Sequence, residues 1–311
     1  MAEEWTHKSV MLGEVLEALR PRAGGRYVDG TLGLAGHAAA ILRTSSPDGF
    51  LYGSDRDASA LEVARERLAE FAGRFELRQK NFSELADGIE QRSCDGLLLD
   101  LGVSSPQLDV AGRGFSFQQD GPLDMRMDQG QSLTAAGLVN ELSEMDLAKL
   151  FWELGDEPAS RKYARAIVQA RERSRLKMTG ELARLIERLN PRRGSRVHPA
   201  TRVFQALRMA VNDEVRSLES GLAAAWTLLR PGGRMAVISF HSVEDRLVKD
   251  FGRERARDYA VQGEMDLPEF RVPRPPDLKL VTRKPVTPTD SEVTENPRAR
   301  SAKMRVFERL R

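Results

Sequence analysis

A glycine-studded turn between an apolar strand and a helix is the feature that most constrains this chain. Residues 27–37 read Tyr-Val-Asp-Gly-Thr-Leu-Gly-Leu-Ala-Gly-His, and a helical pattern follows over 38–42. This order puts backbone N–H groups at a helix N-terminus, where they can face a nucleotide-like ligand. A second strand-like run ends in Asp55, at the spacing of about twenty residues where an acid accepts ribose hydroxyls. The pair predicts a Rossmann-like α/β fold.

The chemistry of the turn narrows the ligand class. It has neither the spacing of a pyrophosphate-binding loop nor a lysine or arginine to meet phosphate charge. Asp29 is expected at its mouth, where an acid repels phosphates and suits a cationic or amine-bearing ligand. S-adenosylmethionine carries a sulfonium, an amino group and a ribose. The sequence therefore favours methyl transfer over hydride transfer.

Five apolar runs predict a parallel sheet of the class I methyltransferase type, closed by an antiparallel hairpin. The fourth run is continuously apolar, as in strands buried on both faces. A proline-rich loop is expected over 266–277. The predicted strands are 26–29, 50–55, 75–77, 96–100 and 234–240, with 278–284 and 303–309 as the hairpin.

More than a hundred residues separate the fourth and fifth strands, far more than a crossover needs. Most of them follow a helical pattern, which indicates an inserted all-helical subdomain and then one long crossover helix over 201–229. We therefore expect a methyltransferase domain formed by 1–106 and 212–311, and an inserted helical RNA-recognition domain over 107–211. The expected helices of the insertion are 135–142, 144–154, 159–173 and 179–189.

Basic residues concentrate in this insertion although the net charge of the chain is only +2. Residues 161–177 hold seven basic side chains and one acid, and 192–208 hold five arginines and no acid. Such clusters indicate either a solvated helix face or a phosphate-binding surface. Phe115 and Phe117, beside Arg113, either stack on bases or pin a loop to the core.

Asp100, followed by Ser104-Ser105-Pro106, ends the fourth strand. Ligands of doubly wound sheets bind at this edge, so Asp29, Gly33 and Asp100 should converge there. An acceptor bonded to an amine N–H can hold its nitrogen in line with a methyl donor, which makes Asp100 the first catalytic candidate. His241, at the end of the fifth strand, either contacts substrate or caps the next helix, where Ser242 and Asp245 resemble a capping box.

Other classes are disfavoured. The longest apolar runs fall short of the roughly 18–20 residues that span a bilayer, and the acidic N-terminus is unlike a signal peptide. Cys94, the single cysteine, is expected to be a small buried side chain, and the four histidines lack metal-site spacing. We expect a cytoplasmic protein with no metal and no membrane partner.

Nine motifs stand in the order of one family. On them the chain, from His7 to Arg309, resembles the bacterial 16S ribosomal RNA (cytosine-N4) methyltransferase family. They are Asp29-Gly30-Thr31, Gly36-His37, Asp55-Arg56-Asp57, the stretch from Asp100 to Gln107, Arg113 to Phe117, Gly121 to Met127, His198 to Arg202, Ser239 to Ser242 and Glu295 to Ser301.

The resemblance implies S-adenosylmethionine as methyl donor and the N4 amine of cytidine 1402 as acceptor, with 16S rRNA in the small ribosomal subunit as partner. The family commonly has Gly-Gly-His where this chain has Ala35-Gly36-His37, and alanine tolerates a positive φ poorly; we therefore expect either a helical Ala35 or a slightly altered loop. The alternatives are a DNA or protein amino-methyltransferase and a non-catalytic RNA-binding assembly factor; a homodimer is left open. The implied cofactor contacts are Ala35, Gly36, His37, Asp55, Phe82, Asp100 and Gln107.

Overall fold

The chain forms two compact units in this computed structural model, which describes residues 8–102, 108–191, 198–263 and 265–311. The sheet unit comprises 1–102 and 217–311, and the helical unit comprises 103–216. The junctions lie at 102/103 and 216/217, not at 106/107 and 211/212 as expected. The chain leaves the sheet directly after strand four, at Gly102 with its φ of 111°, and re-enters within a helix.

The sheet unit is built on seven strands in the order β3-β2-β1-β4-β5-β9-β8. The first five are parallel, β9 is antiparallel to β5, and β8 is antiparallel to β9. This confirms the Rossmann-like methyltransferase class with its closing hairpin. The strands are β1 (Arg26–Asp29), β2 (Phe50–Asp55), β3 (Phe75–Gln79), β4 (Cys94–Asp100), β5 (Leu229–Ser239), β8 (Leu278–Leu280) and β9 (Lys303–Arg309).

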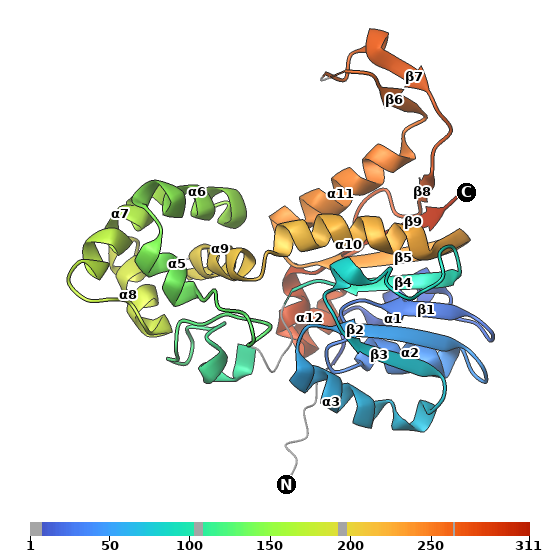
Figure 1. The fold of residues 1–311 in the computed structure, drawn as a ribbon, viewed down its shortest axis with the longest axis horizontal. Helices are drawn as coiled ribbons and strands as arrows, with labels where there is room; N and C mark the ends of the chain where they lie inside the picture. Colours follow the sequence, from blue (N-terminus) through green and yellow to red (C-terminus); the bar gives the residue numbers. More distant parts are fainter. Residues whose placement is uncertain (1–7, 103–107, 192–197, 264) are drawn as a thin grey trace. The chain divides into compact units, whose positions relative to one another are not determined.

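Helices cover both faces of this sheet (Figure 1). Successive strand residues point to opposite faces: Tyr27 packs with the helices α1 to α3, and Val28 with α10 and α11. Both side chains are fully buried, which explains the unbroken apolar runs. The helices are α1 (Leu12–Leu19), α2 (Gly36–Thr44), α3 (Ala58–Arg67), α10 (Glu214–Leu228), α11 (Ser242–Ala256) and the short α12 (Asp290–Glu295).

The helical unit has a core of its own. It contains α5 (Ala135–Glu141), α6 (Glu144–Gly155), α7 (Ser160–Arg171), α8 (Thr179–Leu189) and α9 (Thr201–Val211). No helix in the described ranges is long and apolar enough to cross a membrane.

Two predictions about secondary structure were wrong. The helix expected over 201–229 is broken into α9 and α10, because Asp213 has a left-handed φ of 49° and the buried Asn212 amide bonds to the backbone of Met125 and Met127. The loop expected over 266–277 contains β7 (Arg271–Pro273), which pairs with β6 (Tyr259–Val261). That ribbon projects beyond the end of α11 (Figure 1).

Candidate active site

The glycine turn after β1 is fastened to strands on both sides. The Gly30 N–H donates to the Leu98 carbonyl (3.0 Å), and the Leu32 N–H donates to the Ser54 carbonyl (3.0 Å). A Cβ on Gly30 would lie 2.6 Å from the Leu99 side chain, and one on Gly36 would lie 1.9 Å from Ser9 Oγ. A side chain at either position would therefore force a neighbouring side chain to move.

Ala35 occupies the N-cap position of α2 and is fully buried. Its φ and ψ of 58° and 28° are left-handed, a conformation that costs an alanine about 1 kcal/mol. The residue is therefore not helical. The turn keeps the backbone conformation that glycine adopts readily, and the chain accepts a small strain there.

Asp29 lies beneath the turn and not at its mouth as expected. Its side chain is 1% exposed, and its Oδ1 accepts the Thr31 N–H at 3.2 Å. Burial raises the pKa of Asp29 to about 7, opposed by the Thr31 hydrogen bond and assisted by the charge of Asp55. The Asp29 carboxyl group therefore bonds to the turn from its buried side.

Asp55 is bonded to two backbone segments. Its Oδ2 accepts the Gly33 N–H at 2.8 Å, and its Oδ1 accepts the Asp57 N–H at 2.9 Å. Burial raises the pKa of Asp55 despite these bonds. Each carboxylate oxygen has a second lone pair, so Asp55 can accept hydroxyl hydrogens while it holds the glycine turn.

Asp100 meets the turn from the end of β4. Its N–H donates to Thr31 Oγ1 at 2.5 Å, which links the ends of β1 and β4. Among the described residues, its buried Oδ1 has no hydrogen-bond partner. Burial, followed by the charges of Asp29 and Glu244, raises the pKa of Asp100 well above its usual value. An unpartnered buried acceptor among acids suits a cationic or amine-bearing ligand.

The remaining predicted cofactor contacts differ in how far the structure describes them. Phe82 opens a short 3-10 helix after β3, and its Cβ would lie 3.2 Å from a Cβ on Gly30. It therefore borders the glycine turn, with its ring against Gly221 of α10. Gln107, like Ser104-Ser105-Pro106, lies outside the described residues.

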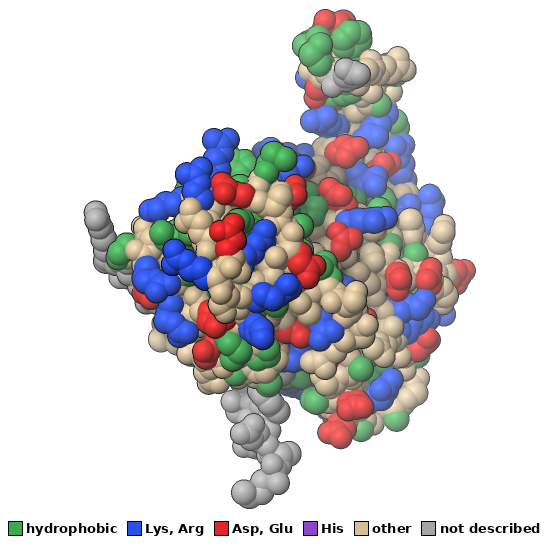
Figure 2. Space-filling model, turned by 60° about the vertical axis from the view of Figure 1, so that its left-hand side comes forward, with side chains coloured by type: hydrophobic (Ala, Val, Ile, Leu, Met, Phe, Trp, Pro, Cys, Tyr) green, Lys and Arg blue, Asp and Glu red, His purple; other side chains and the backbone are tan. Residues whose placement is uncertain are grey.

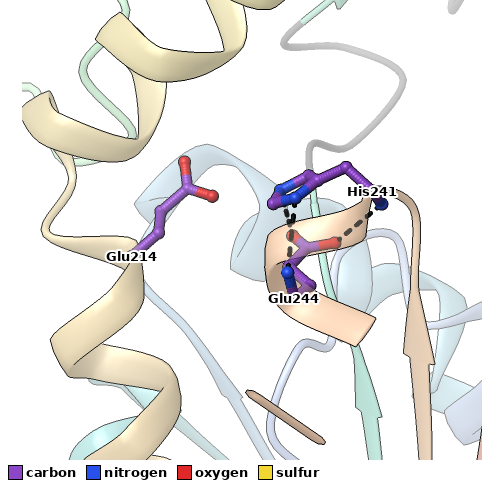
Figure 3. Close-up of side chains that lie close together, drawn as sticks. All are labelled: Glu214, His241 and Glu244. Carbon is purple, nitrogen blue, oxygen red and sulfur yellow. Dashed lines mark hydrogen bonds and ion pairs between the residues drawn. The ribbon is translucent and has the colours of Figure 1, made fainter. Parts of the chain in front are cut away.

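His241 is the N-cap of α11 (Figure 3). Glu244 completes a capping box: the Glu244 N–H donates to His241 Nδ1 (3.4 Å), and Glu244 Oε2 accepts the His241 N–H (3.3 Å). The same Oε2 also accepts the Phe240 N–H (2.8 Å). The capping box expected at Ser242 and Asp245 is thus displaced by one residue, and a role of His241 in chemistry stays a prediction. Glu214, also drawn in Figure 3, pairs with Arg208 at 2.7 Å.

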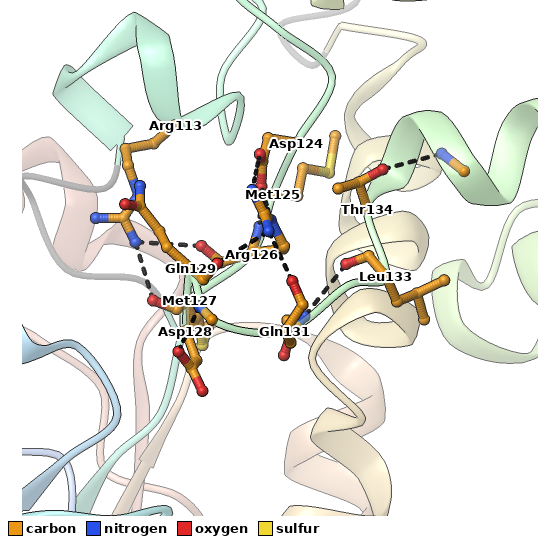
Figure 4. A network of polar contacts seen from close by, with 12 residues as sticks. Arg113, Asp124, Met125, Arg126, Met127, Asp128, Gln129, Gln131, Leu133 and Thr134 are labelled. Carbon is orange, nitrogen blue, oxygen red and sulfur yellow. Dashed lines mark hydrogen bonds and ion pairs between the residues drawn. The ribbon is translucent and has the colours of Figure 1, made fainter.

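The arginines of the loop before α5 are used for structure. Arg126 makes two 2.8 Å bonds to the Asp124 carboxylate, and Arg113 donates to the carbonyls of Arg126 and Met127 (Figure 4). Phe115 is buried in the core of the helical unit, and Phe117 packs 4.8 Å from Phe204 between ring centroids. Of the two alternatives for this segment, the loop pinned by aromatic side chains is correct.

Basic side chains of 161–177 are largely exposed on the helical unit, where Figure 2 shows Lys and Arg spread over one face with acids among them. Some are partly engaged: Arg165 pairs with Glu144 at 3.3 Å, and Lys162 donates to the Leu189 carbonyl at 2.8 Å. Arg161 and Arg173 are exposed. Three arginines of the second cluster, 192, 193 and 196, lie outside the described residues.

The strand order and the glycine turn with Asp55 on the next strand are those of a Rossmann-like methyltransferase. The chain belongs to the MraW methylase family, whose profile matches residues 4–310. Its cofactor is S-adenosylmethionine.

Related proteins align with nearly the whole length of this chain. It is 53% identical to the ribosomal RNA small subunit methyltransferase H of Geobacter sulfurreducens, over 98% of this chain and 99% of that protein. It is 49% identical to the protein of the same name from Geotalea uraniireducens, over 99% of each. A solved SAM-dependent O-methyltransferase from Thermotoga maritima is 11% identical with a TM-score of 0.43, covering 99% of this chain and 69% of that one.

Sequence reasoning missed two residues of the site. Thr31 binds the Asp100 backbone, but a threonine after an acid and a glycine indicates only a local turn. Glu244 raises the pKa of Asp100 and completes the cap of α11. A Glu three residues after the N-cap residue is the signature of a capping box. Histidine is an uncommon N-cap residue, so the sequence favoured Ser242 as the N-cap of this helix.

Proposed function

We propose that this enzyme methylates the exocyclic N4 amine of a cytidine, position 1402, in the 16S rRNA of the small ribosomal subunit, in the cytoplasm. The relatives' shared name, ribosomal RNA small subunit methyltransferase H, supports the substrate class. The resemblance in sequence motifs supports the particular amine. The single observation that carries the chemistry is the buried Asp100 Oδ1 that lacks a partner among the described residues.

The residues around the turn fit S-adenosylmethionine. The cofactor supplies an activated methyl group on a positively charged sulfur. Asp55 would accept its ribose hydroxyls, and the acidic surroundings of Asp100 would offset its positive charges. The proposed contacts are Ala35, Gly36, His37, Asp55, Phe82, Asp100 and Gln107.

Asp100 is the proposed catalytic residue. The nitrogen lone pair of a cytosine amine is delocalised into the ring, so the amine needs an acceptor that fixes its orientation. Asp100 Oδ1 would accept one N–H, and its raised pKa suits it to take the proton that the nitrogen releases on methylation. His241 is the weaker candidate because its ring already caps α11.

The helical unit, proposed as the RNA-recognition domain, would bind the substrate backbone through the exposed basic side chains of 161–177. The target base would leave its stack to reach the amine-binding groups. Because acids lie among the basic side chains on the face drawn in Figure 2, we expect a few phosphate contacts there.

The test is labelled methyl transfer to purified small subunits, naked 16S rRNA and DNA, with Asp100→Asn and Asp95→Asn compared. Asp95 is the acid at the other end of β4 and pairs with Arg230, so it is the matched control. We expect at least a 100-fold loss for Asp100→Asn and activity near wild type for Asp95→Asn. Near-normal turnover of Asp100→Asn would remove Asp100 from the mechanism. Preferred methyl transfer to DNA would favour a DNA amino-methyltransferase. RNA binding without methyl transfer would favour a non-catalytic assembly factor.

A further inference from the structure

The ring of His37 is buried between two elements of the sheet unit. It is 6% exposed, and its Nε2 lies 2.9 Å from the Val10 carbonyl oxygen. A carbonyl oxygen can only accept, so Nε2 carries a proton and donates it. In a neutral imidazole the other nitrogen, Nδ1, then presents a lone pair.

That second nitrogen faces Asp100. Nδ1 lies 3.7 Å from Asp100 Oδ2, and the backbone of Asp100 is held separately by Thr31. Besides burial, the charges of the acids Asp29 and Glu244 raise the pKa of Asp100, and a positive charge on the neighbouring ring would oppose them. A proton on Nδ1 makes its contact with Asp100 Oδ2 an ion pair.

We propose that His37 is a positioning residue for the methyl transfer: a protonated imidazole holds Asp100 Oδ2 and leaves Oδ1 directed at the acceptor amine. This role of His37 rests on the proposed function. It adds a task for the His37 side chain that is distinct from the cofactor contact expected of its segment. The positive ring also keeps Asp100 ionised among the neighbouring acids, so that Oδ1 can accept an N–H.

Two variants separate this task from packing. His37→Gln keeps an amide donor at the place of Nε2, for Val10, and loses the group facing Asp100. His37→Asn places its amide nitrogen at the position of Nδ1, where it can donate to Asp100, and loses the Val10 bond. We expect turnover, measured at saturating S-adenosylmethionine so that a change in cofactor affinity does not enter, to fall about 10- to 100-fold in His37→Gln and less in His37→Asn. A purely structural His37 would give the reverse order and overturn the proposal.

A second readout does not depend on activity. Nitrogen NMR of the His37 side chain in the wild-type protein at neutral pH should show both ring nitrogens protonated. In Asp100→Asn it should show the proton on Nε2 alone. A singly protonated ring in both proteins would overturn the proposal. If the wild-type protein methylates neither subunits nor RNA, the proposed function fails while this spectrum still decides the pairing.

Discussion

Asp29→Asn is predicted to stabilise the cofactor-free protein, and to do so more as the pH rises. The Asp29 carboxyl is 1% exposed, and burial raises its pKa from 3.8 to about 7. A folded-state pKa above the unfolded-state value means that the folded chain retains the proton to higher pH. The contribution of Asp29 to the free energy of unfolding is therefore most favourable below pH 4. It is lost as the pH rises to about 7.

The size of the effect follows from the shift. About three pKa units at 1.36 kcal/mol each give a cost of about 4 kcal/mol once the group ionises, as an upper bound. An asparagine keeps the oxygen that accepts the Thr31 N–H and carries no charge. The stability difference between Asp29→Asn and the wild type should therefore grow by about 2–3 kcal/mol between pH 5 and pH 8.

The assay is urea unfolding of both proteins at pH 5, 6, 7 and 8. Asp95→Asn is the control, because hydrogen bonds from Arg26, Arg230 and Arg22 outweigh partial burial and lower the pKa of Asp95. Above pH 5 the Asp95 carboxyl is ionised in the folded and in the unfolded chain. Asp95→Asn should therefore be less stable than the wild type by a constant amount over this range. A difference for Asp29→Asn that stays flat from pH 5 to pH 8 would refute the assignment of a buried, proton-retaining Asp29.

Three further predictions concern other parts of the chain. Gly36→Ala should cost about 1–3 kcal/mol in the free energy of unfolding, and adding Ser9→Ala should restore most of it, because the new Cβ would lie 1.9 Å from Ser9 Oγ; no rescue would show that the glycine is needed for another reason. Asn212→Ala should cost about 2–4 kcal/mol, measured by urea unfolding, because three backbone groups lose their bonds to the amide; a loss below about 0.5 kcal/mol would contradict this. Arg161→Gln with Arg173→Gln should weaken binding to 16S rRNA and lower the salt slope by roughly 0.7–0.9 for each phosphate that the protein no longer neutralises, and an unchanged slope would exclude this surface.

The sheet could be predicted from sequence because its central strands are buried on both faces. Runs such as 97–99 are then continuously apolar. The start of β5 was less predictable, because the strand begins at Leu229 and runs through Pro231-Gly232-Gly233, residues typical of a turn. The acids at strand ends, Asp55 and Asp100, were found for the same reason: parallel strands bring their carboxyl ends to one edge.

The interactions that tune the site could not be predicted, because they join residues distant in sequence. The spacing of residues in the sequence indicates neither the hydrogen bond between Thr31 and Asp100 nor the contact between His37 and Asp100. Asp29 was misplaced because a side chain at a strand end can point beneath a turn as well as into its mouth. The break at Asn212 was missed because neither Asn nor Asp is a strong helix breaker, and tertiary bonds to the Met125 segment decide it.

We propose above that Asp100 orients the N4 amine of one cytidine in 16S rRNA. The most direct measurement is mass spectrometry of small-subunit RNA from cells lacking the endogenous enzyme, complemented with wild type, Asp100→Asn or Asp95→Asn. We expect N4-methylation at cytidine 1402 with the wild type and with Asp95→Asn, and its loss with Asp100→Asn present at equal abundance. Full methylation by Asp100→Asn, or a methyl group on another atom or nucleotide, would contradict it.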